Sequence, residues 1–209
     1  MATSWQQIWT GKLDAEGTQI DTGASAFGEF PFLRLIIDVV ATGSNENGLD
    51  LRFNDDSTAD HYPIRRSLNG AVDNTSLTGY TYWYNGYGGT DISRHCVIDI
   101  ANEKDSEKMI YSNQCLHAGT FSSAPSRQQV WSKWTNADEY ITDVDLSFDN
   151  WGVGAPNQKA DADTKMTIFG GSDGTAVVPS LPNGSVFITS DTNVHYMFNS
   201  SAGTWNEVA

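Results

Sequence analysis

Hydrophobic and polar residues alternate along much of the chain with the period of two that is typical of β-strands. In the segment 140–148, Val144 and Leu146 fall on one face while Asp143 and Asp145 fall on the other. Helical periodicity is nowhere sustained, and Gly, Asn, Asp and Ser residues separate the alternating runs. The pattern therefore predicts an all-β, two-sheet antiparallel sandwich with strands at 4–9, 18–21, 32–40, 49–54, 95–100, 109–111, 129–135, 140–148 and 164–169.

Two hairpins are predicted from these runs. The run 32–40 is apolar almost without a break, which favours a central strand that is covered on both faces. The pair Asn47-Gly48 tolerates the positive φ of a tight return, so 32–40 and 49–54 are predicted to form a hairpin that begins a β-meander. A second hairpin is predicted between 95–100 and 109–111, across a charged turn.

The composition changes near the C-terminus. Small residues from Gly170 onward are followed by Pro179 and Pro182. We therefore predict a sandwich over 1–173, a Gly/Pro linker over 174–182 and a small β module over 183–209. Three strands are too few to bury their own apolar side chains, so the module is expected to pack on the main domain or on another copy of the chain. The residues expected to make that oligomer contact are Phe187, Tyr196, Phe198 and Trp205.

Charge and cysteine content narrow the possible partners. The chain has 26 Asp and Glu against 12 Lys and Arg, and its net charge of -14 repels a phosphate backbone, so nucleic acid is not an expected partner. No apolar run is long enough to span a membrane, because Arg34 and Asp38 interrupt the most apolar segment. Only Cys96 and Cys115 are present, which leaves one disulfide or two free thiols open.

An acidic loop follows the strand at 49–54. It places four oxygen-bearing side chains within seven residues, and such oxygens are the ligands that calcium prefers. A bound calcium ion is therefore one reading, and a solvated turn whose side chains cap backbone groups is the other. The four histidines do not fall at a recognised metal spacing. The candidate calcium ligands are Asn54, Asp55, Asp56 and Asp60.

An aromatic run at 80–87 is the candidate binding site for a sugar. Flat rings with amide or carboxylate groups beside them can stack on sugar faces, although strand alternation would bury half of the rings and an oligomer interface would occupy the rest. No nucleophile elbow, zinc-protease motif or phosphate loop is present, so we expect no enzyme activity and no cofactor other than a possible calcium ion. The candidate glycan-binding residues are Tyr82, Trp83, Asn85, Tyr87 and Asp91.

Three blocks of sequence resemble one known group. The strand-loop segment 51–62, with its Arg52-Phe53-Asn54 core, acidic loop and Tyr62, resembles a segment of jelly-roll virion structural proteins of tailed bacterial and archaeal viruses. The segments 141–146 and 164–170 resemble the two closing strands of that group. The tail 181–208 is similar to short terminal modules on viral surface proteins.

The resemblance implies a jelly roll on the virion surface, as a capsid decoration, turret or tail-fibre protein. It also implies a homo-oligomer, commonly a trimer, in contact with other virion proteins, and it implies no catalytic residues. The expected function is thus that of a non-enzymatic virion structural protein. The alternative is a carbohydrate-binding module that recognises a host-surface glycan.

Overall fold

The computed structural model describes residues 4–24, 26–40, 49–68, 71–77, 83–84, 93–117, 125–148, 159–172, 186–188, 195–199 and 204–208. The chain divides into two compact units, Met1–Asp173 and Gly174–Ala209. All regular structure among the described residues is β-strand. The strands of the first unit are β1 (Ser4–Lys12), β2 (Gln19–Asp21), β3 (Phe32–Val39), β4 (Asp50–Phe53), β5 (Ile64–Leu68), β6 (Ala71–Leu77), β7 (Trp83–Tyr84), β8 (Ser93–Ala101), β9 (Lys108–His117), β10 (Ser126–Trp134), β11 (Val144–Ser147) and β12 (Lys165–Ser172).

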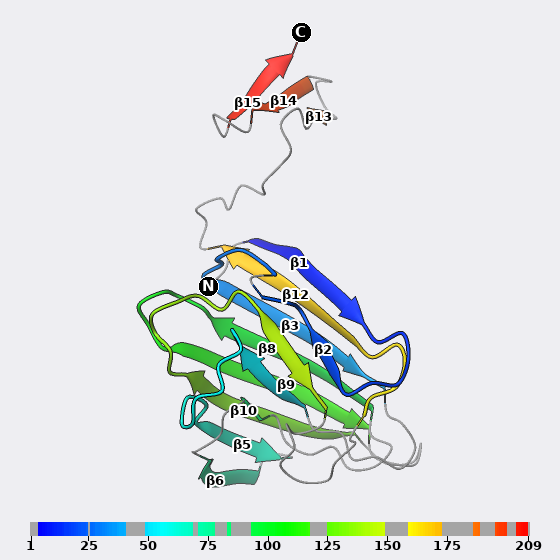
Figure 1. Cartoon of the computed structure of the whole chain (residues 1–209), viewed down its shortest axis with the longest axis vertical. Helices are drawn as coiled ribbons and strands as arrows, with labels where there is room; N and C mark the ends of the chain where they lie inside the picture. Colours follow the sequence, from blue (N-terminus) through cyan, green and yellow to red (C-terminus); the bar gives the residue numbers. More distant parts are fainter. Residues whose placement is uncertain are drawn as a thin grey trace. The chain divides into compact units, whose positions relative to one another are not determined.

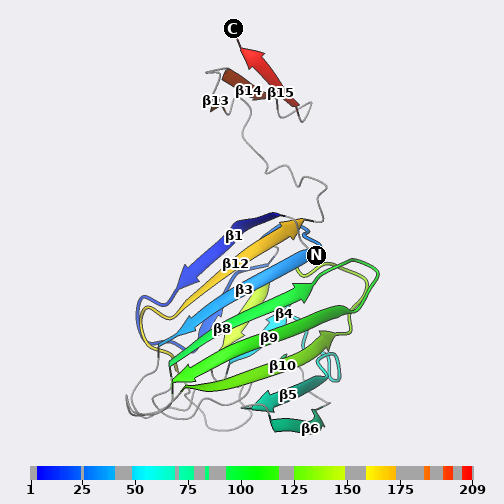
Figure 2. The ribbon, with the colours of Figure 1, turned by 180° about the vertical axis from the view of Figure 1, so that it is seen from behind.

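The first unit is an antiparallel β-sandwich, as the alternation predicts. A large eight-stranded sheet has the order β1-β12-β3-β8-β9-β10-β5-β6, and a small four-stranded sheet has the order β2-β11-β4-β7. Figures 1 and 2 show the large sheet as a broad layer that extends from β1 at one edge to β6 at the other. The predicted all-β sandwich is therefore confirmed.

The strand pairing is that of a jelly roll. Four antiparallel pairs are nested along the chain, with β1·β12 outermost, then β2·β11, β3·β8 and β4·β7. Successive pairs lie alternately in the large and the small sheet, so the paired ribbon wraps around one core. The strands β5 and β6 and the strands β9 and β10 are additions to this plan, and both extend the large sheet beyond β8.

The core lies between the two sheets. Alternate residues of the large sheet, such as Leu35 and Ile98, face residues of the small sheet such as Leu51 and Leu146, and all four are fully buried. Phe53 packs against Tyr62 and Trp134 with ring centroids 6.0 Å and 5.9 Å away. Each large buried side chain contributes about 1.5–3 kcal/mol relative to exposure, so this shared layer holds the sheets together.

The structure corrects the first predicted hairpin. The strands β3 and β4 belong to different sheets and do not pair, so they do not form a hairpin. The strand β3 is also covered on only one face. Leu33, Leu35 and Ile37 are buried, whereas Phe32 and Arg34 on the opposite face are half-buried. The apolar run was misleading because Phe32 and Ile36 are apolar residues on the outer face.

The second predicted hairpin is confirmed, since all of β8 pairs with residues 109–117 of β9. The register places Cys96 opposite Gln114 and Cys115 opposite His95. A displacement of one residue puts two side chains on opposite faces of a sheet, and the two cysteines are accordingly one buried and one exposed thiol, with no disulfide between them.

The second unit contains a three-stranded sheet in the order β13-β14-β15, formed by β13 (Val186–Ile188), β14 (His195–Asn199) and β15 (Thr204–Val208). The predicted linker 174–182 lies outside the described residues. Gly170 and Gly171, which the sequence analysis places at the start of the flexible region, belong to β12 and pair with Leu33 and Phe32. A Cβ atom at Gly170 would lie 2.5 Å from the ring of Phe30, so the glycine there provides space for a core aromatic ring.

Candidate binding surface

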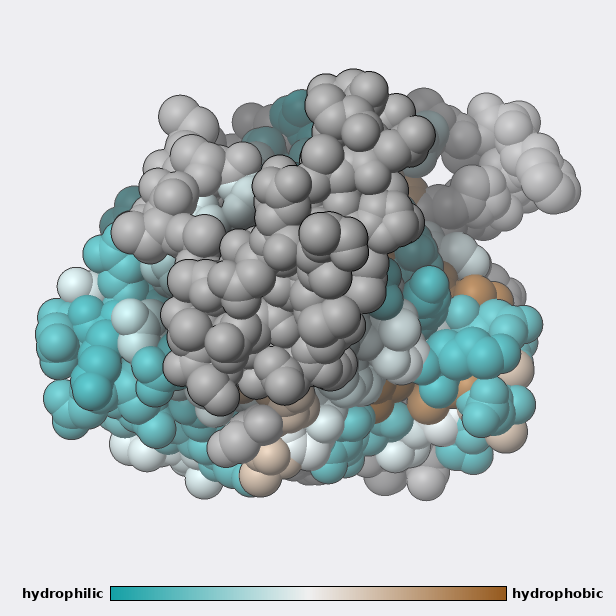
Figure 3. Space-filling view, turned by 90° about the horizontal axis from the view of Figure 1, so that it is seen from above, coloured by the Kyte–Doolittle hydropathy of each residue, from teal (hydrophilic) through white to brown (hydrophobic). Residues whose placement is uncertain are grey.

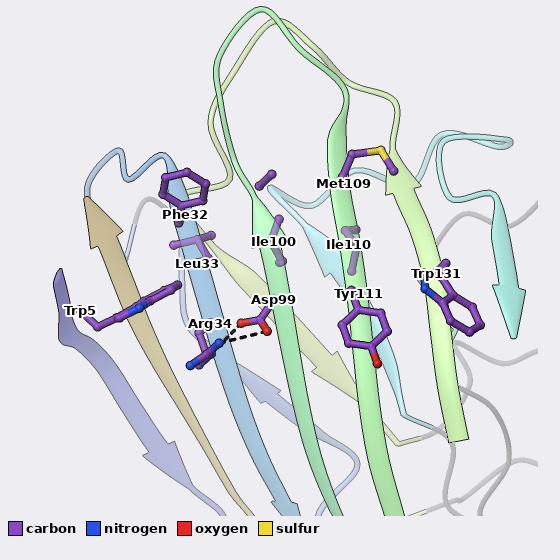
Figure 4. Close-up of a pocket in the computed structure, with 11 residues that line it drawn as sticks. Trp5, Phe32, Leu33, Arg34, Asp99, Ile100, Met109, Ile110, Tyr111 and Trp131 are labelled. Carbon is purple, nitrogen blue, oxygen red and sulfur yellow. Dashed lines mark hydrogen bonds and ion pairs between the residues drawn. The ribbon is translucent and has the colours of Figure 1, made fainter. Parts of the chain in front are cut away.

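An open groove of about 490 Å³ crosses the outer face of the large sheet. Five strands contribute side chains to it, and Figure 4 shows these side chains side by side across the sheet. A smaller hollow of about 290 Å³ adjoins it and shares Met109 and Trp131. The groove-lining side chains that stand on the outer face of the sheet are Trp5, Phe32, Arg34, Asp99, Met109, Tyr111 and Trp131.

Strand register brings these residues together. Arg34 lies opposite Asp99, Asp99 lies opposite Tyr111, and Tyr111 lies opposite Trp131, so one row crosses β3, β8, β9 and β10. An adjacent row contains Trp5 and Phe32, which are both paired with Gly171. Residues directly opposite each other on antiparallel strands have Cβ atoms about 4.5–5.5 Å apart, so the first row is a continuous line of side chains. In the second row Gly171, which has no side chain, separates Trp5 from Phe32.

An ion pair lies in the middle of the groove. The Arg34 guanidinium donates Nε–H to Asp99 Oδ1 at 2.6 Å and Nη2–H to Asp99 Oδ2 at 3.1 Å. The hydrogen bond with Asp99 raises the pKa of Arg34, while partial burial opposes this. The guanidinium carbon also lies 4.9 Å from the centroid of the Trp5 ring. Trp5 and Asp99 together fix the Arg34 side chain in place.

Aromatic rings dominate the other end of the groove. Tyr111 and Trp131 pack with ring centroids 5.9 Å apart and an interplanar angle of 44°. Gln129 donates an Nε2 hydrogen to the Tyr111 hydroxyl at 2.8 Å, which fixes that hydroxyl. Trp131 is 46% exposed and Met109 is 60% exposed, so these side chains are not part of the core. Flat, fixed and exposed rings of this kind can accept a ligand by stacking.

The predicted glycan site on the aromatic run 80–87 is not supported where the structure describes it. Trp83 is fully buried in the core opposite Leu51, so its ring cannot stack on a ligand, and this prediction is wrong for Trp83. The strand β7 has only two residues, and alternation over so short a run does not show which residue faces inward. Tyr82, Asn85, Tyr87 and Asp91 lie outside the described residues.

The predicted calcium ligands mainly bond to the protein itself. Asn54 Oδ1 accepts hydrogen bonds from the backbone N–H groups of Thr142 and Asp143 at 2.9 Å and 3.2 Å. The Asn54 amide donates to the carbonyl oxygen of Tyr140 at 2.7 Å. Asp60 is exposed and has a φ of 68°. The loop is thus a turn whose Asn54 side chain joins two parts of the chain.

Asp56 is the centre of a second set of hydrogen bonds in this loop. Its Oδ2 lies 2.6 Å from both His61 Nδ1 and Trp134 Nε1, and its Oδ1 accepts from the Thr58 backbone N–H at 2.9 Å. Burial acts to raise the pKa of Asp56, but the hydrogen bonds from His61, Thr58 and Trp134 outweigh it and lower the pKa. Asp56 therefore links the loop after β4 to Trp134 on β10 and to His61.

Three carboxylates meet on the outer face of the small sheet. Asp145 lies opposite Asp21 on the neighbouring strand and interacts with both Asp21 and Asp55. Burial, followed by these two acidic neighbours, raises the pKa of Asp145 to about 8. Of the predicted calcium ligands, only Asp55 belongs to this cluster. Among the residues that the structure describes, no group of three His, Cys, Asp or Glu side chains is arranged to hold a metal ion.

The predicted oligomer contacts lie in the second unit. The backbone of Phe187 is paired with that of Tyr196, and the backbone of Phe198 is paired with that of Trp205. The four positions are therefore neighbours in one three-stranded sheet, as two cross-strand pairs.

Two comparisons with known sequences give no match for this chain. A scan against protein-family models finds no match, and a search of curated proteins finds none either.

Within the described part of the chain there is no helix long and apolar enough to cross a membrane. In the view of Figure 3, the described residues form a mainly hydrophilic surface that is interrupted by a brown hydrophobic area on one side.

The groove is a site that the sequence analysis does not identify. Trp5 and Trp131 enter that analysis only as members of the predicted strands 4–9 and 129–135. The available signal is the alternation in β10, where Trp134 and Val130 are buried while Trp131 faces outward. Alternation of this kind assigns Trp131 to the polar face of its strand, and a Trp on a polar face is a sign of a binding surface.

Proposed function

We propose that the sandwich is a non-catalytic carbohydrate-binding domain and that the groove on the large sheet is its binding site. The observation that carries this proposal is the set of exposed, fixed aromatic rings around a central ion pair. The rings offer apolar faces to the C–H groups of a sugar. The Arg34–Asp99 pair and the Tyr111 hydroxyl offer donors and acceptors to sugar hydroxyl groups.

Glycan-array screening followed by calorimetry tests the proposal with Trp131→Ala as the main variant. Loss of a ring that is fully used in binding costs about 1–3 kcal/mol, so the affinity should fall about tenfold or more. Val40→Ala is the matched control, because Val40 is 37% exposed and lies outside the residues that line the groove. Absence of binding by the parent protein, or equal binding by both variants, would refute the proposed site.

The second candidate function is that of a virion surface component. The fold supports this candidate, since a jelly roll with an attached three-stranded unit is what the resemblance to virion structural proteins implies. A surface protein of this type and a glycan-binding domain are compatible roles, because attachment to a host requires recognition of its surface. Detection of the protein on purified particles and its mass in solution test the candidate. A strict monomer that is absent from particles would contradict it.

A further inference from the structure

We infer that the groove binds an extended, uncharged sugar chain that crosses the strands and contacts Trp5 at one end and Trp131 at the other. This inference rests on the proposed carbohydrate-binding function and specifies the class of ligand. It excludes a single terminal sugar and an acidic polysaccharide as the main ligand. Three properties of the groove support it, namely its length, its charge and the distribution of its polar groups.

The length of the groove exceeds that of one sugar ring. Trp5 is on β1 and Trp131 is on β10, and the order β1-β12-β3-β8-β9-β10 places five interstrand steps between them. At about 4.8 Å a step, the backbones of the two residues are about 24 Å apart along the sheet, and the Trp5 ring leans inward over Arg34, still three strands away from Trp131. Both line the same groove, and the adjoining hollow continues past Trp131 toward Pro63 and Arg65. A ligand that uses both tryptophans must therefore be a chain.

The groove between the tryptophans has no net charge. Among the residues that the structure describes, Arg34 and Asp99 are the only charged ones that line it, and they neutralise each other through two hydrogen bonds. The chain as a whole has a net charge of -14, which repels a polyanion. Two further cations, Arg65 and Lys133, line the adjoining hollow past Trp131 and not the groove between the tryptophans, and Lys133 is paired with Glu107 at 2.7 Å. These charges favour a neutral chain.

The polar groups lie between the rings and suit hydroxyl groups. A guanidinium has five N–H donors and Asp99 takes two of those of Arg34, which leaves donors for a ligand. The Tyr111 hydroxyl accepts from Gln129 and keeps its own hydrogen for an acceptor oxygen. Sugars in the middle of a chain would contact these groups, while sugars nearer its ends would stack on Trp131 and Trp5 (Figure 4).

The test measures affinity against chain length. Neutral cello-, xylo- and manno-oligosaccharides of increasing length are titrated into the full chain, and oligogalacturonides of the same lengths serve as the anionic counterpart. For one neutral series we expect the affinity to rise with length until the chain spans both tryptophans, and then to level off. Trp131→Ala should weaken every length about tenfold or more, and Trp131→Phe should retain most of the affinity.

Trp5→Ala separates the inference from the proposed function. It should weaken binding of the long oligosaccharides severalfold and leave the short ones, which reach only Trp131, unchanged. If affinity is independent of length and only Trp131 matters, the inference is wrong while the proposed function stands. If the anionic series binds more tightly, the inferred neutrality is wrong. If no oligosaccharide binds and Trp131→Ala instead converts a dimer to a monomer, both are wrong and the face is a contact between copies.

Discussion

Asp145→Asn should make the protein more stable at neutral and alkaline pH. Asp145 is only 7% exposed, and two further carboxylates, Asp21 and Asp55, lie against it. The burial and these neighbours raise its pKa from an ordinary value of 3.8 to about 8. Between these two values the folded protein holds a proton that the unfolded chain has released. The free energy of unfolding therefore falls as the pH rises through this window.

The size of the effect follows from the linkage between protonation and folding. If the whole pKa shift is realised, raising the pH from 3.8, the ordinary pKa of the carboxyl group, to 7 lowers the free energy of unfolding by about 4 kcal/mol. Asp21 and Asp55 are exposed, and solvent screens their charges, which reduces the expected gain to about 1–3 kcal/mol. Asparagine keeps the shape of the side chain and can donate a hydrogen bond to either carboxylate. It does not titrate, so this part of the pH dependence should disappear.

Urea unfolding followed by tryptophan fluorescence, at several values between about pH 4 and pH 8, measures the difference between the two proteins. Asp60→Asn is the control, because it removes the same single charge from an exposed residue whose φ of 68° Asn tolerates. The gain for Asp145→Asn should be largest near pH 8 and should vanish near pH 4. A gain that is equal to that of the control, or that does not change with pH, would show that the three carboxylates do not interact as described.

Two further predictions concern the loop after β4 and the thiols. Tyr62→Phe should lower the free energy of unfolding by about 1–3 kcal/mol. The buried Tyr62 hydroxyl donates to the Asp56 carbonyl at 2.8 Å and accepts from the Phe53 N–H at 3.3 Å. Unchanged stability in urea would contradict this role of the hydroxyl. In the native protein Cys115 should react quickly with a thiol reagent while Cys96 reacts only on unfolding, and release of two equivalents without denaturant would show that Cys96 is not buried.

Local patterns in the sequence predicted local structure. The β8–β9 hairpin was predictable because both strands and their turn lie within one short stretch of chain. The pairing of β1 with β12 was not, because it joins Ser4 to Ser172 and no local pattern records a partner so far away. The separation of β3 and β4 into two sheets was missed for the same reason. Whether the next strand along the chain joins the same sheet or the opposite one depends on how all the strands pack together.

The candidate site was less predictable than the fold. The aromatic run 80–87 was prominent in the sequence, but its Trp83 fills the core. The rings that face outward are dispersed, since Trp5 and Trp131 are far apart along the chain and line one groove only through the order and register of the sheet. A period of two indicates that a residue faces away from the core. It does not indicate which other residues stand beside it on that face.

The position of the groove allows binding and stability to change independently. Trp131 and Met109 stand on the outer face of the large sheet, and the core between the sheets is closed without them. Large-to-small substitutions are costly when they leave a cavity among buried neighbours, and an exposed ring leaves none. An exposed aromatic side chain on a sheet face adds little to folding and much to any contact made there. The fold therefore does not require the exposed rings beside the Arg34–Asp99 pair, whereas the proposed ligand would use them.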